Sequence, residues 1–160
     1  MSYSTNGNVE AFERDQKERF GQLLREHVRE RGVQFVGEET RYGEISIAQT
    51  VCGQEGCRHA NIDMTSEERR RRNIPPGYYE DADLPEAEKT SCNQEREEYM
   101  SNRVLAEAGE AESVLVICGR LHTEAVAAHL RKLGQAAEIT DLRAQSWYVE
   151  DWFGHTMRNL

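Results

Sequence analysis

The sequence predicts an α/β fold, in which a mostly parallel sheet of about four strands carries helices on both faces in three layers. Short apolar runs alternate along the chain with amphipathic helical patterns, as expected for βαβ units. One run, Val114–Cys118, is apolar without interruption, which is typical of a central strand buried on both faces of a parallel sheet. We expect one domain over residues 1–160, with residues 1–17 as a candidate flexible segment and residues 75–92 as a loop excursion.

The first part of the chain predicts two helices and a strand. A charged helix is expected over residues 8–32, because its apolar side chains recur on roughly one face and Gly32 follows them as a typical stop. The apolar positions of this face are Val9, Phe12, Phe20, Leu23, Leu24 and Val28. A short strand over residues 33–37 and a shorter helix over residues 44–51 come next.

The middle of the chain predicts a second strand and another helix. Residues 59–64 have the composition of a strand. Thr65 or Ser66 then caps a helix whose first turn is acidic, which suits the positive end of the helix dipole. The sequence Ile74-Pro-Pro-Gly77 ends this helix, and the acidic segment up to about Lys89 is expected to be a loop.

The last part predicts a helix, the apolar strand, its crossover helix and a final strand. Residues 94–108 form a helical pattern, with Tyr99, Val104 and Leu105 facing inward. After the strand over residues 114–118, an amphipathic helix begins within about three residues of Gly119 and ends at Gly134. Residues 137–142 are expected to form the last strand, followed by an aromatic tail over residues 147–160.

Charge and hydropathy exclude several classes of protein. The net charge of −9 argues against a nucleic-acid backbone as the main partner. The basic cluster Arg69–Arg72 follows Glu67 and Glu68, so a solvated helix face with local ion pairs is its simpler interpretation. Apolar runs stay well short of the ~20 residues that cross a bilayer, and the N-terminus lacks the features of a signal peptide. We therefore expect no membrane partner and a cytoplasmic location.

Polar residues follow three of the predicted strands. Glu38 and Glu39 come after the first strand, Asp63 with Arg69 after the second, and His122 after the apolar strand. Because the carboxyl ends of parallel strands meet along one edge of a sheet, we expect these side chains to gather there. Carboxylates with a histidine make an acid/base site or a divalent-metal site, and the mixture suits zinc, manganese or iron better than calcium.

The cysteines offer an alternative metal site. Cys52, Cys57 and His59 have a spacing that could hold a structural zinc ion, with Cys92 as a further ligand. Cys118 lies within the apolar strand and is most simply a small core residue.

Several segments together resemble a known superfamily. The chain resembles small bacterial proteins of unknown function that are themselves similar to the Tiki/TraB-like superfamily, which includes erythromycin-esterase-like and haem-uptake members. The resemblance covers roughly residues 18–145, in which the family's paired glutamates match Glu38-Glu39 and its G-x-x-H motif matches Gly119–His122. The segments that carry it are Val33–Glu39, Asn61–Thr65 with Glu68-Arg69 and Ile74-Pro75, Arg96–Met100 and Val116–His122.

The resemblance implies a hydrolytic role, because some members are regarded as metal-dependent proteases and others as hydrolases of esters. Glu38, Glu39 and His122 are then the expected catalytic residues. Glu39 and His122 would bind a zinc or manganese ion, whose bound water would be the nucleophile. Alternatively, they would act together as a general acid and a general base. The substrate would be a small molecule or a peptide.

Three further residues are expected to serve this site. Asp63 would orient a ligand directly, or hold in position the residues that contact the ligand. Arg69 and Arg96 would hold an anionic group of the substrate or fix a site carboxylate.

Two other functions stay open on the sequence. The chain could be a non-catalytic ligand-binding or protein-interaction module on the same fold, for which the aromatic tail offers a partner surface and homo-oligomers are an option. The chain could instead be a regulatory domain whose fold is stabilised by a zinc ion bound to Cys52, Cys57 and His59.

Overall fold

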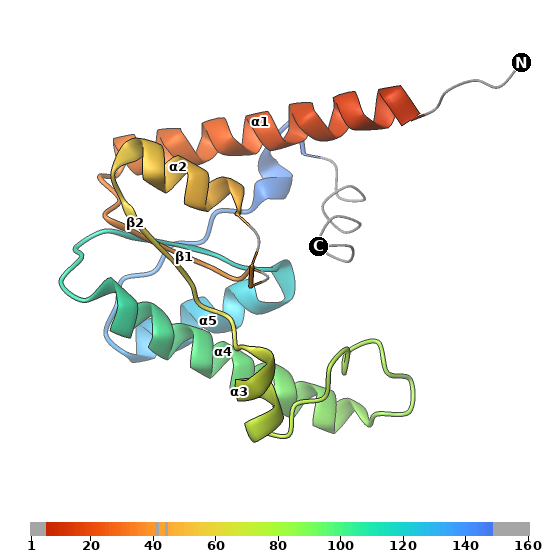
Figure 1. Ribbon diagram of the computed structural model, residues 1–160. Helices are drawn as coiled ribbons and strands as arrows, with labels where there is room; N and C mark the ends of the chain where they lie inside the picture. Colours follow the sequence, from red (N-terminus) through yellow and green to blue (C-terminus); the bar gives the residue numbers. More distant parts are fainter. Residues whose placement is uncertain (1–5, 41, 44, 149–160) are drawn as a thin grey trace, which may run out of the picture.

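The computed structural model describes residues 6–40, 42–43 and 45–148 (Figure 1). Within these residues, five α-helices and three strands follow one another, and a short 3₁₀ helix, η1, comes last. In chain order they are α1 (Asn6–Glu30), β1 (Phe35–Glu38), α2 (Ile47–Glu55), β2 (Arg58–Asn61), α3 (Ser66–Arg71), α4 (Glu86–Ala108), β3 (Val114–Ile117), α5 (Arg120–Lys132) and η1 (Leu142–Ala144).

The sheet is parallel throughout, in the order β2-β1-β3. Phe35 lies opposite Arg58 on one side and Val114 on the other, and Glu38 lies opposite Asn61 and Ile117. The three carboxyl ends are therefore level with one another. The predicted α/β class is confirmed, but the described sheet has three strands rather than four.

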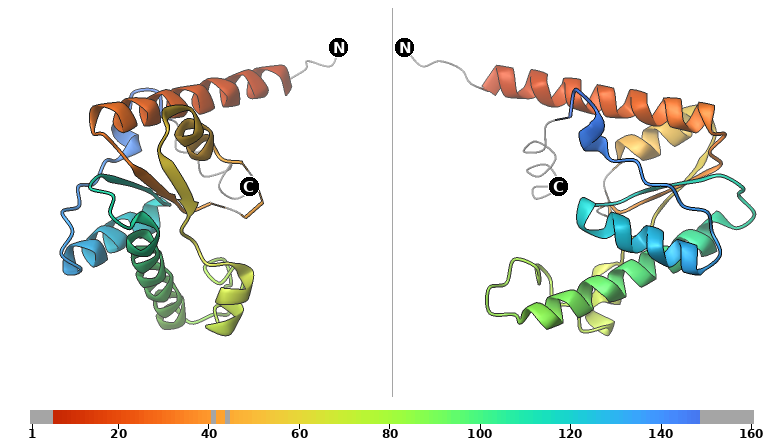
Figure 2. Two further views of the ribbon diagram at one scale, coloured as in Figure 1. Left: turned by 60° about the vertical axis from the view of Figure 1, so that its left-hand side comes forward. Right: turned by 180° about the vertical axis from the view of Figure 1, so that it is seen from behind.

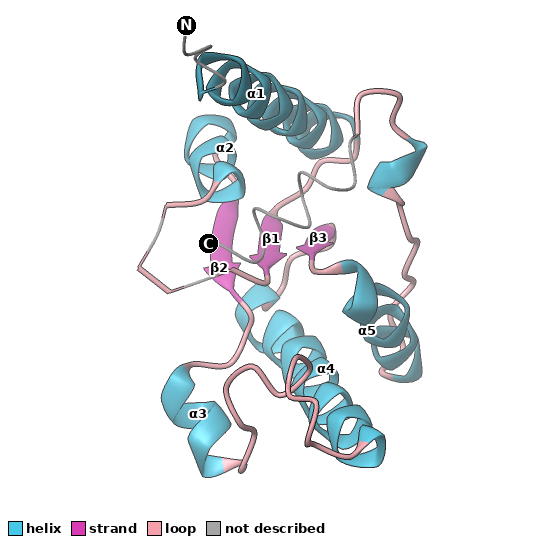
Figure 3. Cartoon of the chain, turned by 90° about the vertical axis from the view of Figure 1, so that its right-hand side faces the viewer, coloured by secondary structure: helices cyan, strands magenta, loops and turns pink. Residues whose placement is uncertain are grey.

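Helices cover both faces of this sheet, as Figure 3 shows. On one face, Val36 of β1 packs with buried residues of α1 and α2, including Leu24 and Val51. On the other, Val104 of α4 and Val126 of α5 belong to a second apolar cluster. The two clusters arise because successive residues of a strand point to opposite faces. The domain is thus three layers deep, with α1 and α2 above the sheet and α4 and α5 below it.

The apolar strand β3 lies at an edge of the sheet, not at its centre as the sequence predicted. Each of its four residues is only partly buried. Strand β1 is central instead, and all four of its residues are buried. The apolar run of β3 is accounted for by the two clusters, because Leu115 and Ile117 pack on one face and Val114 and Val116 on the other.

The prediction of a strand over residues 137–142 is wrong. Ala137 packs against the cluster below the sheet, whereas Leu142 packs against the cluster above it. The segment therefore crosses the outer side of β3 from one face to the other instead of running along it (Figure 2). Polar contacts hold it in this path: Arg131 donates to the Ala137 carbonyl, and Arg31 pairs with Glu138 at 2.9 Å.

Some helix boundaries also differ from the predicted ones. Helix α4 begins at Glu86, so residues 86–92 are helical rather than part of a loop excursion. Pro85 precedes the helix, and Glu86 and Glu88 in its first turn face the positive end of the helix dipole. Helix α2 runs later than predicted because Ser46 is its N-cap. Residues 6–17, within the candidate flexible segment, belong to α1.

Two further expectations concern the membrane and the tail. None of the helices in the described part of the chain combines the length and the apolar character needed to span a bilayer. Trp147, at the start of the predicted aromatic tail, is partly buried against the cluster above the sheet. The remainder of that tail, residues 149–160, lies outside the described residues.

A substitution at Gly37 tests how closely β1 packs on α4. A β-carbon at Gly37 would lie 2.9 Å from Ile62 Cγ2 and 3.3 Å from Val104 Cγ2. Gly37→Ala should therefore lower the free energy of unfolding by about 1–3 kcal/mol, because this overpacked core has to shift. Gly53→Ala is the control, since the space at Gly53 on α2 is open and alanine favours a helix. Urea unfolding of both variants measures the difference; equal stabilities would contradict the close packing.

Candidate functional site

The paired glutamates at the carboxyl end of β1 point to opposite faces of the sheet. Glu39 contacts residues of α4 and the turn before α5, on the lower face. Glu38 contacts Ser46 before α2 and His59 of β2, on the upper face. This separation follows from the alternation of side chains along a strand. Of the two glutamates, only Glu39 therefore joins the predicted group around His122.

Arg96 of α4 is the centre of the group on the lower face. Its buried guanidinium donates from Nη2 to Glu39 Oε1 at 2.8 Å and to Asp63 Oδ2 at 3.0 Å. Nη1 lies 3.4 Å from the hydroxyl of Tyr78. Burial opposes the charged form of Arg96, but Asp63, the hydrogen bond to Tyr78 and Glu39 outweigh it and raise the pKa of the guanidinium above its ordinary value. Arg96 is consequently a permanent cation inside the network.

His122, in the first turn of α5, is buried between Arg96 and Glu97. Its Nδ1 lies 2.9 Å from Glu97 Oε1, so Nδ1–H donates to that carboxylate. Its Nε2 lies 3.4 Å from Arg96 Nη1 and 3.8 Å from Glu39 Oε1. The partners of the two nitrogens assign the proton to Nδ1 and leave the Nε2 lone pair facing the guanidinium.

Glu97 is a site residue that the sequence reasoning missed. It lies on the inward face of α4 together with Met100, Ser101 and Val104. A glutamate at a helical spacing from apolar core positions is the signal that could have identified it, because a buried carboxylate needs a partner.

The glycine of the G-x-x-H motif is Gly119, which contacts Glu39 through its backbone. Its backbone N–H donates to Glu39 Oε2 at 2.7 Å, and a β-carbon there would lie 3.4 Å from the same oxygen. The glycine immediately precedes α5, so the motif ties Glu39 of β1 to the helix that carries His122.

Asp63 and Arg69 complete the network below β2. Asp63 Oδ2 accepts from Arg69 as well as from Arg96, and its Oδ1 accepts from the Met64 backbone N–H at 2.7 Å. Both arginines therefore fix site carboxylates, one of the two roles predicted for them. Five predicted residues, Glu39, Asp63, Arg69, Arg96 and His122, thus lie in one network.

The other predicted residues lie elsewhere. Glu38 accepts from Ser46 and lies 2.8 Å from His59 Nε2 through the same oxygen, Oε2. Cys52 is buried in the upper cluster, where burial and the neighbouring Cys57 raise the pKa of its thiol. His59 thus faces Glu38, away from the Arg96 network.

The geometry of the network bears on the predicted metal site. Glu39 and His122, the predicted ligands, both contact the Arg96 guanidinium, which already supplies a positive charge between them. Over residues 6–40, 42–43 and 45–148, no group of three or more His, Cys, Asp or Glu side chains is arranged to hold an ion, and this includes Cys52, Cys57 and His59. Within these residues, the side chains therefore form no ready group of ligands for a divalent metal.

Cys118 lies close to the network but is a poor nucleophile. Its sulfur is 3.7 Å from Thr123 Oγ1, and burial raises the pKa of the thiol to about 11. Because only the thiolate attacks, this residue is best regarded as part of the packing.

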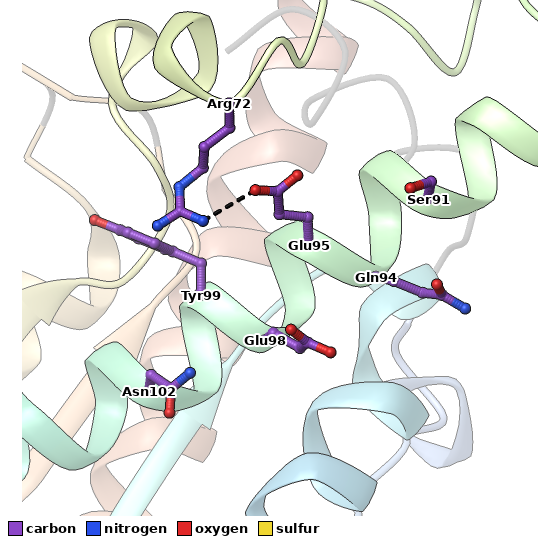
Figure 4. Close-up of a pocket in the computed structure, with 7 residues that line it drawn as sticks. All are labelled: Arg72, Ser91, Gln94, Glu95, Glu98, Tyr99 and Asn102. Atoms are coloured by element: carbon purple, nitrogen blue, oxygen red, sulfur yellow. Dashed lines mark hydrogen bonds and ion pairs between the residues drawn. The ribbon is translucent and has the colours of Figure 1, made fainter.

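An open hollow of about 410 Å³ lies on the outward side of α4 (Figure 4). Arg72 and Tyr99 form part of its lining, with the Arg72 guanidinium 5.4 Å from the centre of the tyrosine ring and 3.0 Å from Glu95 Oε1. Arg96 and Glu97 face inward from the same helix, so this hollow and the His122 network lie on different sides of α4.

Comparisons of the chain with protein-family models, with curated proteins and with solved structures gave no match.

Replacing Arg96 tests whether the network depends on its cation. Arg96→Met leaves Glu39 and Asp63 without their shared partner, which should lower the free energy of unfolding by about 3–5 kcal/mol. Arg19→Met is the control, because the pair between Arg19 and Asp15 is about half exposed and such pairs contribute about 0–1 kcal/mol. Denaturant unfolding measures both. A loss in Arg96→Met no larger than in the control would show that the network is not a stabilising centre.

A second test concerns acid stability. Tyr99 donates to Glu68 Oε1 at 2.5 Å and, as the largest cause, lowers the pKa of Glu68 to about 2. The folded pKa lies below the usual value of about 4.3, so this stabilisation is present above that pH and is lost as the pH falls towards 2. Tyr99→Phe should therefore destabilise the protein more at pH 7 than near pH 2, as measured by urea unfolding; a pH-independent difference would contradict the coupling.

Proposed function

We propose that this chain is a hydrolase-like protein that uses the buried network around His122 and Arg96 for acid/base chemistry on a small-molecule or peptide substrate. The observation that carries the proposal is the orientation of His122. Glu97 fixes Nδ1 at 2.9 Å, and Nε2 is left beside a guanidinium. A histidine oriented by a carboxylate is a common arrangement for a general base. A cytoplasmic setting belongs to the same proposal.

His122 Nε2 would take a proton from an attacking water molecule. Glu97 holds the ring through Nδ1–H and stabilises the imidazolium that forms, as a buried carboxylate does in hydrolytic triads. The proton would then pass from Nε2 to the leaving group. His122 therefore needs one carboxylate partner to act as a base. Helix α4 provides that partner as Glu97, the residue that follows Arg96.

Arg96 would stabilise negative charge on the substrate. Its contacts with Glu39 and Asp63 are short, at 2.8 and 3.0 Å, whereas its Nη1 contacts with His122 and Tyr78 are both 3.4 Å. The weakly held Nη1 is thus the donor that a carbonyl oxygen can engage while the carboxylates keep the guanidinium in place. A fixed cation aimed at developing charge is among the largest contributions to catalysis.

The resemblance to the Tiki/TraB-like superfamily supports the same site, because its paired-glutamate and G-x-x-H motifs supply Glu39, Gly119 and His122. For this chain we propose the acid/base form of that chemistry, since Arg96 provides the positive charge that a metal would bring. Glu38 takes no part in this site, because it faces Ser46 and His59 on the other side of the sheet.

A non-catalytic binding module is the second candidate. The polar hollow outside α4, with Tyr99 beneath Arg72, is the observation that favours it. An aromatic ring with a cation and amide side chains around it offers stacking and hydrogen bonds to a small polar ligand.

The base is tested with His122→Gln and Glu97→Gln. Against a panel of peptide amides, each variant should lose roughly a hundred-fold or more in kcat/KM, the usual contribution of a positioned acid/base group. His129→Gln is the matched control, because His129 lies in the last turn of the same helix, distant along α5 from the network. Hydrolysis by the wild type that survives both site variants would contradict the proposed roles. Absence of hydrolysis with binding at Tyr99 would favour the binding module.

Chelation separates the acid/base form from the metal-dependent form. After dialysis against EDTA, hydrolysis of the same panel should be unchanged, because the proposed charges all belong to side chains. Loss of turnover that returns with zinc or manganese would show that an ion, rather than Arg96, supplies the positive charge.

A further inference from the structure

The upper face of the sheet carries a second group of reactive side chains, made by Ser46, Glu38 and His59. The Ser46 hydroxyl donates to Glu38 Oε2, and His59 Nε2 lies 2.8 Å from the same oxygen. The side chains of Glu38 and His59 are each about nine-tenths buried. The Glu38 carboxylate is therefore largely shielded from water. These residues come from the loop before α2, the end of β1 and β2 respectively.

This geometry matches the requirements of a serine nucleophile. A serine hydroxyl attacks only when a neighbouring base can take its proton, and that base must itself be oriented by a third group. Glu38 is the base within hydrogen-bond reach of Ser46, and His59 is the group that orients it. Here the carboxylate, rather than the imidazole, contacts the serine.

A hollow gives a ligand access to Ser46. It has a volume of about 260 Å³ and lies between α1 and α2, with Ser46, Ile47 and Val51 on one side and Gly21 and Lys17 on the other. This volume is smaller than the roughly 300–1,000 Å³ typical of pockets for drug-sized molecules. Ile47 and Val51 form an apolar part of this lining, and Lys17, Glu18 and Arg25 add charged groups to it. The small size of the hollow suits a short acyl group.

We propose that Ser46 is the nucleophile of a second site, which accepts the acyl group of small carboxylic esters. Ser46 Oγ attacks the ester carbonyl carbon while its proton passes to Glu38. The bond between that carbon and the alcohol oxygen breaks, and the alcohol leaves with the proton. Water then attacks the acyl-serine, a proton returns through Glu38 to Ser46 Oγ, and the carboxylic acid leaves.

The start of α2 favours this position for a developing oxyanion. Ser46 is the N-cap of the helix, so the backbone amides of Ile47 and Ala48 follow it directly. The first amides of a helix have no intrahelical acceptor and can donate to a negative oxygen.

A fluorophosphonate probe tests the proposal, because it reacts with an activated serine by forming a Ser–O–P bond and releasing fluoride. The full-length protein should be labelled, and mass spectrometry of its peptides should place the label on Ser46. Ser46→Asn should abolish it without unfolding the helix, since asparagine is as good an N-cap as serine. Glu38→Gln should slow labelling by roughly a hundred-fold, as expected for the loss of a general base.

Two controls keep this site apart from the one around His122. Ser91→Ala removes a serine that lines the hollow outside α4, and labelling should be retained. His122→Gln should also retain it, so that loss of hydrolysis in that variant and loss of labelling in Ser46→Asn report on different sites. An unlabelled wild type, a label on another residue, or labelling that persists in a folded Ser46→Asn would each overturn the proposal; circular dichroism establishes folding.

Discussion

The ion pairs of Arg96 are the interaction on which the lower half of the molecule depends. Through Glu39 and Asp63, one guanidinium joins the end of β1, the segment after β2 and helix α4. Taking these charges out of water carries a large cost, which their mutual attraction offsets only when the geometry is good. The short contacts to both carboxylates meet that condition. The position of His122 follows from the same arrangement, because Glu97 is the next residue of α4 and fixes its ring.

The alternation of side chains in β1 is the second constraint, because it divides consecutive glutamates between two chemical environments. Glu39 enters a network with arginines, whereas Glu38 meets only a hydroxyl and an imidazole among its described contacts. A shift of one residue in the register of β1 would exchange these partners. Gly37 makes such a shift costly, since Ile62 and Val104 fill the space where a side chain would be.

Much of the fold could be predicted from local patterns, and the failures have physical causes. Strands were expected over residues 33–37, 59–64 and 114–118, and each overlaps an observed strand, because short runs between helical patterns are a local signal. The order of strands is not local, so an apolar edge strand was mistaken for the central one. Residues 137–142 have a strand-like composition but cross the edge of the sheet, which only tertiary contacts decide. In the site, the meeting of Glu39, Asp63 and His122 follows from parallel strands, whereas the roles of Glu97 and Ser46 depend on how α4 and α2 pack.

The path of residues 137–142 has a consequence for how the protein behaves in solution. An apolar strand at the edge of a sheet presents unpaired backbone groups, which in other proteins recruit strands from neighbouring molecules. Here the crossing segment lies over the outer side of β3, anchored by Arg131 on one face and by Leu142 on the other. In this position, it blocks the pairing of β3 with a strand from a neighbouring molecule. Among the described residues, the sheet therefore ends at β3, and residues 137–142 lie over its outer side.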